Sequence, residues 1–333
     1  MSVFRSIGVS VEGSIELILF FILGASVYVG WNIGANDTAN CIGPTVGCGL
    51  LTFRKAVVLV AIFVILGGVL QGHHVLKTIG KGIVKTELNH TAIMVTLICS
   101  GFFVTLATFF RIPTSTSQAI VGGIIGIGLA VGARIDYSQI ITIAESWVIC
   151  PFLAMALSFI LSHVLSFVLR RIRISAILVQ NALVWLAIIS SCYVAYSLGA
   201  NHAGIAVGLI SNIGGVHPFI LLFIGSAAIA AGAITYGKKV TDTVGKGITP
   251  LDIQGAFVAQ TSSALGIHFF SILGIPISTS SAIVGAVIGV GLTKGSKAIS
   301  KKTIWTIFGG WVLTPFLAAG SSFLIYKIIS FAI

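Results

Sequence analysis

Long apolar runs constrain this chain more than any other feature of its sequence. Ten runs approach the length of about 20 residues that an α-helix needs to cross a bilayer, and short polar connections separate them. In lipid, backbone polar groups must find their partners within the protein, so runs of this length favour membrane-spanning helices. We expect these helices near 14–35, 56–76, 91–110, 114–133, 138–169, 175–198, 217–236, 250–273, 277–293 and 303–332.

The composition excludes several other classes of protein. Only 8% of the 333 residues are charged and 56% are hydrophobic, whereas a soluble domain carries about 25% charged residues. The chain is therefore neither a soluble globular protein nor a disordered one. Its net charge of +11 reflects the Lys and Arg that membrane proteins concentrate in cytoplasmic loops. The excess of Lys and Arg over Asp and Glu therefore bears on how the chain is oriented in a membrane and does not indicate a nucleic-acid partner.

Several sequence blocks occur twice in the same order. Gly34-Ala35-Asn36 recurs as Gly199-Ala200-Asn201, the block 78–83 recurs as 243–248, and 113–122 recurs as 276–285. The blocks predict two repeats, 1–172 and 173–333, of about five membrane segments each. Because five is odd, the second repeat enters the membrane inverted, as in many secondary transporters. We therefore predict an all-α polytopic membrane protein with two inverted-topology repeats.

The distribution of basic residues predicts the orientation of the chain. When the N-terminus is placed on one side, most of the 19 Lys and Arg fall in loops on the opposite side. The positive-inside rule then makes both termini external. The compact length favours the plasma membrane of a prokaryote. Trp147, Trp305 and Trp311 are expected in an aromatic belt at the membrane interface.

Two of the apolar runs are unlike the rest. The runs that begin at Thr114 and Ile277 are rich in glycine and open with Ser and Thr after a proline, which predicts broken or re-entrant helices. A helix that starts there presents hydroxyls, free N–H groups and the positive end of its dipole, which together suit an anion. Inversion would point both helix starts at one site near the midplane. The alternative is that the hydroxyls only cap the helices.

Asp37 carries the other candidate site. It lies among amides in the segment 34–40, at the end of an apolar run whose glycines could unwind the helix. A charge at membrane depth usually faces a cavity or a pathway. Carboxylate, amide and carbonyl oxygens are also the ligands that hard cations prefer. We therefore interpret Asp37 as a cation ligand, the alternative being a helix cap at the interface.

These motifs resemble the inorganic phosphate transporters of the PiT class over nearly the whole chain. The resemblance lies in the segment 34–40 with Gly43-Pro44, in the stretch 243–250, and in the paired blocks at 113–118 and 276–281. It implies a secondary transporter that imports inorganic phosphate with sodium, or possibly protons, and that forms a homodimer. It implies no cofactor other than the coupling ion and no enzyme activity. The histidines also show no partner carboxylate at catalytic spacing, and the Gly-Lys-Gly sequences lack the Walker context.

The resemblance also assigns residues, position by position. It implies cation and substrate contacts at Asn36, Asp37, Asn40 and Asn201, with sodium at the first three. It implies phosphate contacts at Ser115, Thr116, Ser117, Gln118, Ser278, Thr279, Ser280 and Ser281. This chain departs from the family in having His202 where an aspartate is common, and Gln118 and Ser281 where a histidine is common.

The mechanism that we expect is alternating access with a cation bound first. A phosphate anion near an unpaired Asp37 would meet like-charge repulsion and a desolvation cost, both of which a cation offsets. Phosphate also carries a proton that Asp37 can accept in a hydrogen bond, whereas sulfate carries none. A sulfate symporter of the same fold is the first alternative. An anion channel with the hydroxyl blocks as its filter is the second.

Overall fold

The computed structural model describes residues 11–110, 114–171, 175–211, 213, 215–241, 251–295 and 301–332. These residues are almost entirely helical, and the isolated bridge between Val84 and Ile135 is the sole β-type pairing among them. The all-helical membrane architecture is confirmed. The boundary at 172 and 173, the stretch 243–250 and Pro113 lie outside the described residues.

Each of the ten predicted runs corresponds to one main helix of the structure. The first half holds α2 (Val11–Gly47), α3 (Phe53–Gln71), α5 (His90–Phe109), α6 (Thr116–Val131) and α7 (Tyr137–Arg171). The second half holds α8 (Ala176–Val207), α9 (Pro218–Tyr236), α11 (Ile253–Ile272), α12 (Thr279–Thr293) and α13 (Lys301–Ala332). Short helical turns follow α3 and α8, namely α4 (His73–Lys77), η1 (Thr78–Gly82) and η2 (Gly208–Ile210).

Fewer of these helices are full spans than the ten apolar runs suggest. Within the described residues, seven helices are long and apolar enough to cross a membrane. Helices α6 and α12 are shorter, with 16 and 15 residues, as expected for broken or re-entrant segments. Helix α11 has the length of a span but carries the polar run Gln260-Thr261-Ser262-Ser263. The expectation that two of the ten runs are not plain spans agrees with the lengths of α6 and α12, and among the described residues α11 is a third helix that falls short of a span.

Helix α2 also differs from the expected unwound turn at its glycines. It remains helical through the segment 34–40 and ends at Gly47. Gly34 instead permits close packing, because a Cβ at this position would overlap the carbonyl group of Ile229 on α9. In the second half, a Cβ at Gly199 of α8 would overlap the carbonyl of Val64 on α3. The paired glycines thus bring the helices of one half against those of the other.

The same crosswise packing joins the short helices to the long ones. A Cβ at Gly122 of α6 would overlap the carbonyl oxygen of Pro315 on α13, and one at Gly285 of α12 would overlap that of Pro151 on α7. The halves of the chain are therefore interleaved. Each short helix lies against a long helix of the other half.

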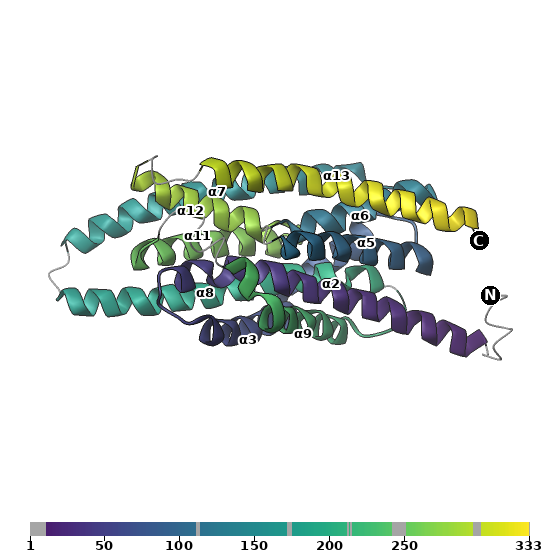
Figure 1. The fold of residues 1–333 in the computed structure, drawn as a ribbon, viewed down its shortest axis with the longest axis horizontal. Helices are drawn as coiled ribbons and strands as arrows, with labels where there is room; N and C mark the ends of the chain where they lie inside the picture. Colours follow the sequence, from purple (N-terminus) through teal and green to yellow (C-terminus); the bar gives the residue numbers. More distant parts are fainter. Residues whose placement is uncertain are drawn as a thin grey trace.

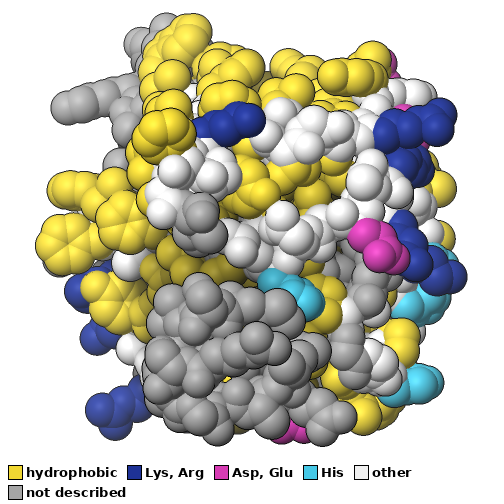
Figure 2. Space-filling model, turned by 90° about the vertical axis from the view of Figure 1, so that its right-hand side faces the viewer, with side chains coloured by type: hydrophobic (Ala, Val, Ile, Leu, Met, Phe, Trp, Pro, Cys, Tyr) yellow, Lys and Arg dark blue, Asp and Glu magenta, His cyan; other side chains and the backbone are white. Residues whose placement is uncertain are grey.

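The helices run roughly parallel to the long axis of the molecule (Figure 1). Helices α7 and α13 lie along one side, α3 and α9 along the opposite side, and the remaining helices between them (Figure 1). The beginning of α2 and the end of α13 lie at the same end of the molecule, and the end of α7 and the beginning of α8 lie at the other (Figure 1). Phe316 of α13 is 72% exposed, as suits a side chain in lipid. Figure 2 shows the end near the termini, where charged and histidine side chains gather beside hydrophobic ones.

Candidate functional site

Helices α6 and α12 begin in the same way. Ser115 precedes α6 in extended conformation, and its Oγ accepts a hydrogen bond from the Gln118 N–H at 3.3 Å. Ser278 precedes α12 in nearly the same conformation and accepts from the Ser281 N–H at 3.1 Å. The first N–H groups of a helix have no partners within it, and the dipole makes this end positive. The repeated blocks thus form two matching helix starts, with Ser115 and Ser278 as their caps.

Asp37 joins these two helix starts. Thr116 Oγ1, in the first turn of α6, donates a hydrogen bond of 2.6 Å to Asp37 Oδ2. Ser280 Oγ, in the first turn of α12, lies 3.4 Å from Asp37 Oδ1 and 2.9 Å from the carbonyl oxygen of Thr114. Asp37 is fully buried. A carboxylate on α2 therefore lies between two helix N-termini that come from different halves of the chain.

Asn40 extends this cluster by one turn of α2. Its Nδ2 donates to Asp37 Oδ1 at 3.1 Å and also lies 3.3 Å from Thr279 Oγ1. Its Oδ1 is buried and has no hydrogen-bond partner among the described residues. Because buried polar atoms normally find partners, this oxygen beside a buried carboxylate is suited to a bound cation.

Asn36 and Asn201 hold the two extended segments. Asn36 Oδ1 accepts from the Thr114 N–H at 3.2 Å, and its Nδ2 donates to Thr108 Oγ1 at 2.8 Å. Asn201 Oδ1 accepts from the Ile277 N–H at 3.2 Å, and its Nδ2 donates to Ser271 Oγ at 3.1 Å. These contacts position the helix starts. A direct role of either amide with a cation or substrate stays a prediction.

The other predicted site residues make local or separate contacts. Ser117 Oγ lies 3.3 Å from Ser115 Oγ, and Ser281 Oγ donates to the Ser278 carbonyl at 2.8 Å. Gln118 lines a mainly apolar cavity of 480 Å³ between α7 and α13. Its Oε1 is buried and unpaired among the described residues. The structure thus brings Thr116, Thr279 and Ser280 to the Asp37 cluster, whereas Gln118 faces the apolar cavity.

Sequence reasoning missed three residues that shape the site. Thr108 and Ser271, the partners of Asn36 and Asn201, each lie five residues before the proline of a repeated block, so the repeat itself carried a usable signal. Gln260 of α11 donates to the Cys41 carbonyl at 2.7 Å and so ties α11 to α2. No pattern in the sequence distinguishes Gln260.

Trp147 also lies differently from the expected aromatic belt. It is half-buried, and its indole Nε1–H donates to the carbonyl oxygen of Pro276 at 3.2 Å. Pro276 belongs to the extended segment before α12. Trp147 therefore supports the second helix start, whereas Trp305 is 68% exposed.

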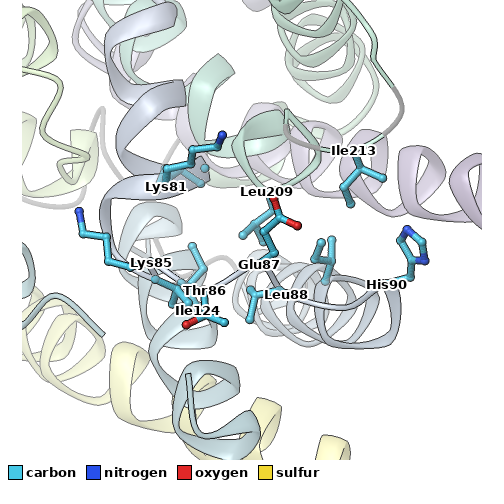
Figure 3. A pocket seen from close by; sticks show the side chains of 13 residues that line it. Lys81, Lys85, Thr86, Glu87, Leu88, His90, Ile124, Leu209 and Ile213 are labelled. Carbon is cyan, nitrogen blue, oxygen red and sulfur yellow. The ribbon is translucent and has the colours of Figure 1, made fainter. Parts of the chain in front are cut away.

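A polar cavity lies apart from these residues. It has a volume of 440 Å³ and is lined by Lys81, Lys85, Glu87 and His90 together with apolar side chains (Figure 3). Lys85 forms an ion pair of 3.2 Å with Asp136. The backbone N–H of Gln139 and the Lys85 ammonium hold the pKa of Asp136 below its ordinary value. None of the predicted phosphate or cation ligands lines this cavity.

Comparison with known proteins adds independent findings. A family described as the phosphate transporter family matches residues 33–322. A putative phosphate permease of Methanocaldococcus jannaschii is 31% identical over 96% of this chain and 100% of its own length. The chloroplastic inorganic phosphate transporter 2-1 of Arabidopsis thaliana is 26% identical over 99% of this chain and 76% of its own length. A solved structure described as the sodium-dependent phosphate transporter matches with a TM-score of 0.85 and 27% identity, over 95% of this chain and 100% of that one.

Proposed function

The chain belongs to the phosphate transporter family, and we propose that it imports inorganic phosphate by sodium symport, with Asp37 at the centre of its substrate site. The observation that carries this proposal is the meeting of two helix N-termini at one buried carboxylate. Thr116 and Ser280 contact Asp37 from the two halves of the chain. The family and the similar sodium-dependent phosphate transporter supply the substrate and the coupling ion.

The phosphate lies at the two helix starts. The N–H groups in the first turns of α6 and α12 and their hydroxyls offer donors to a tetrahedral anion, and both dipoles favour negative charge there. Buried hydroxyl side chains are also the groups that a dehydrated oxyanion needs as partners. The proposed phosphate ligands are Ser115, Thr116, Ser117, Ser278, Thr279, Ser280 and Ser281, whereas the side chain of Gln118 lines the apolar cavity beside α7 and α13.

Sodium binds at Asp37 with Asn40 and Asn36. No Lys or Arg forms an ion pair with Asp37 among the described residues. A buried carboxylate without a cation is costly and repels an incoming anion. The unpaired Oδ1 of Asn40 supplies a further oxygen ligand. Sodium therefore binds before phosphate, and its charge makes the pocket attractive to the anion.

Alternating access follows from two inverted repeats, 1–172 and 173–333. The matching contacts of Asn36 and Asn201 support the repeats. Their inversion is supported by α2 and α8, which start from opposite ends of the molecule (Figure 1). Movement of one repeat against the other opens the site to each side in turn. The distribution of Lys and Arg supports an orientation with both termini outside. The homodimer follows from the resemblance to the family, and the plasma membrane from the compact length of the chain.

Uptake into proteoliposomes tests the proposal. With an inward sodium gradient, we expect the wild type to accumulate radiolabelled phosphate above equilibrium, and an excess of unlabelled sulfate to leave uptake unchanged. Asp37→Asn keeps the shape of the side chain but removes its charge, so accumulation should be lost. Asp136→Asn is the matched control, because Asp136 lies in the connection before α7 and pairs with Lys85.

The possible results separate the alternatives. Undiminished accumulation by Asp37→Asn would refute the assignment of the cation site. Uptake that only reaches equilibrium would indicate a channel. Competition by sulfate would indicate a sulfate carrier. Accumulation driven by a proton gradient alone would show that protons, not sodium, are the coupling ion.

A further inference from the structure

The two halves differ at the positions that build the cation site. Asn36 and Asn201 match in sequence and in their contacts with the segments before α6 and α12. The next residue is Asp37 in the first half but His202 in the second. Three residues further, Asn40 is matched by Ile205. The second half thus places an imidazole and a hydrocarbon side chain where the first places a carboxylate and an amide.

Neither replacement suits sodium. Sodium, like other hard cations, prefers oxygen ligands. A neutral imidazole offers nitrogen, a charged one repels the ion, and an isoleucine offers no ligand atom. His202 and Ile205 are both fully buried.

The position of His202 strengthens this conclusion. Its Nε2 lies 3.5 Å from Asp37 Oδ2. The ring therefore fills the space on the second-half side of Asp37. The carboxylate also accepts hydrogen bonds from the Asn40 amide and the Thr116 hydroxyl, which both belong to the first half.

We propose that the chain has a single sodium site, at Asp37, and couples each phosphate to one sodium ion. His202 and Ile205 leave the corresponding pocket of the second half without the carboxylate and the second amide of the first half, although Asn201 and its contact with the Ile277 N–H are retained. The inference rests on the proposed sodium symport and adds the stoichiometry of that same site. One sodium ion taken up with a singly charged phosphate also moves no net charge across the membrane.

Equilibrium binding of ²²Na⁺ to the purified full chain tests the inference without phosphate or transport. We expect one bound ion per wild-type chain, and a sodium dependence of uptake with a Hill coefficient of about 1, since this coefficient does not exceed the number of sites. The double variant His202→Asp/Ile205→Asn restores the ligands of the first half, and should bind a second ion and raise the coefficient towards about 2. Ile205→Asn alone is the control and should still bind one ion.

Two sodium ions on the wild type would overturn the inference and leave the symport proposal intact. A double variant that elutes as a single species and still binds one ion would also overturn it. If that variant fails to fold, the wild-type stoichiometry decides the question. A wild type that binds no sodium would refute the sodium coupling itself, and the inference with it.

Discussion

Thr116 and Asp37 are joined by a hydrogen bond of 2.6 Å between residues 79 positions apart in the chain. The bond connects the first turn of the short helix α6 to the last third of the long helix α2. Both side chains are buried, with exposed fractions of 1% and 0%. The position of the carboxylate is therefore coupled directly to the start of a helix that is proposed to hold phosphate.

Replacement of Thr116 by valine should weaken sodium and phosphate binding. Valine has nearly the same shape, but it cannot donate to Asp37 Oδ2. A hydrogen bond to a charged group contributes about 1.5–3 kcal/mol, which corresponds to a roughly tenfold to hundredfold rise in half-saturating concentration at about 1.4 kcal/mol per factor of ten. Sodium titrations of phosphate uptake measure this rise.

Thr279→Val provides the comparison from the other half. Thr279 Oγ1 lies 3.3 Å from Asn40 Nδ2 and makes a longer, uncharged contact. We expect a smaller effect, below about tenfold, because a neutral hydrogen bond contributes about 0.5–1.5 kcal/mol. Equal effects of the two substitutions would argue against a special role for the bond to Asp37.

The repeat made one part of this site predictable. Matching Pro-x-Ser-Thr-Ser blocks predicted that both helices start after a proline, and Ser115 and Ser278 do cap them. The same sequence pattern was equally consistent with the alternative that the hydroxyls only cap the helices. Only the structure brings Thr116 and Ser280 together with Asp37, because helix packing between distant segments decides which hydroxyls face the carboxylate.

Other features were beyond local patterns. In the sequence, Gly34 and Gly199 are compatible both with an unwound helix and with close contact between helices. The structure shows close contact, because the carbonyls of Ile229 and Val64 lie where a Cβ would be. Gln118 adjoins the hydroxyls in sequence, yet it lines the cavity between α7 and α13. Adjacent residues on a helix point in different directions, so membership of a motif does not determine which cavity a side chain faces.

Asn201→Ala should destabilise the second helix start. The substitution leaves the buried Ile277 N–H without its partner and removes the bond to Ser271. A buried group left unpaired costs about 1–3 kcal/mol, so the midpoint of thermal unfolding in detergent should fall. Asn36→Ala should have a similar effect through the Thr114 N–H. Asn181→Ala on the exposed part of α8 is the control, and an equal fall there would contradict the interpretation.

Trp147→Phe tests the support of the segment before α12. Phenylalanine retains an aromatic ring but cannot donate to the Pro276 carbonyl. The loss of this bond should lower stability by about 0.5–1.5 kcal/mol, and phosphate uptake should fall with it. Trp185→Phe is the matched control, because Trp185 is 65% exposed. If both variants unfold at the wild-type temperature, the indole hydrogen bond contributes nothing to the helix start.

Gly34→Ala should separate helices α2 and α9 at the level of the site. A Cβ at Gly34 overlaps the Ile229 carbonyl, which is backbone and cannot rotate away. Overpacking of this kind costs about 1–3 kcal/mol. Gly24→Ala, on the same helix, places its Cβ in open space and should be neutral or stabilising by up to about 1 kcal/mol, since alanine favours helices.

Thermal unfolding in detergent and uptake in proteoliposomes measure both variants. Because Asp37 lies one turn beyond Gly34, we expect Gly34→Ala to reduce uptake as well as stability. A Gly34→Ala protein as stable and active as Gly24→Ala would show that the two helices do not require their close approach.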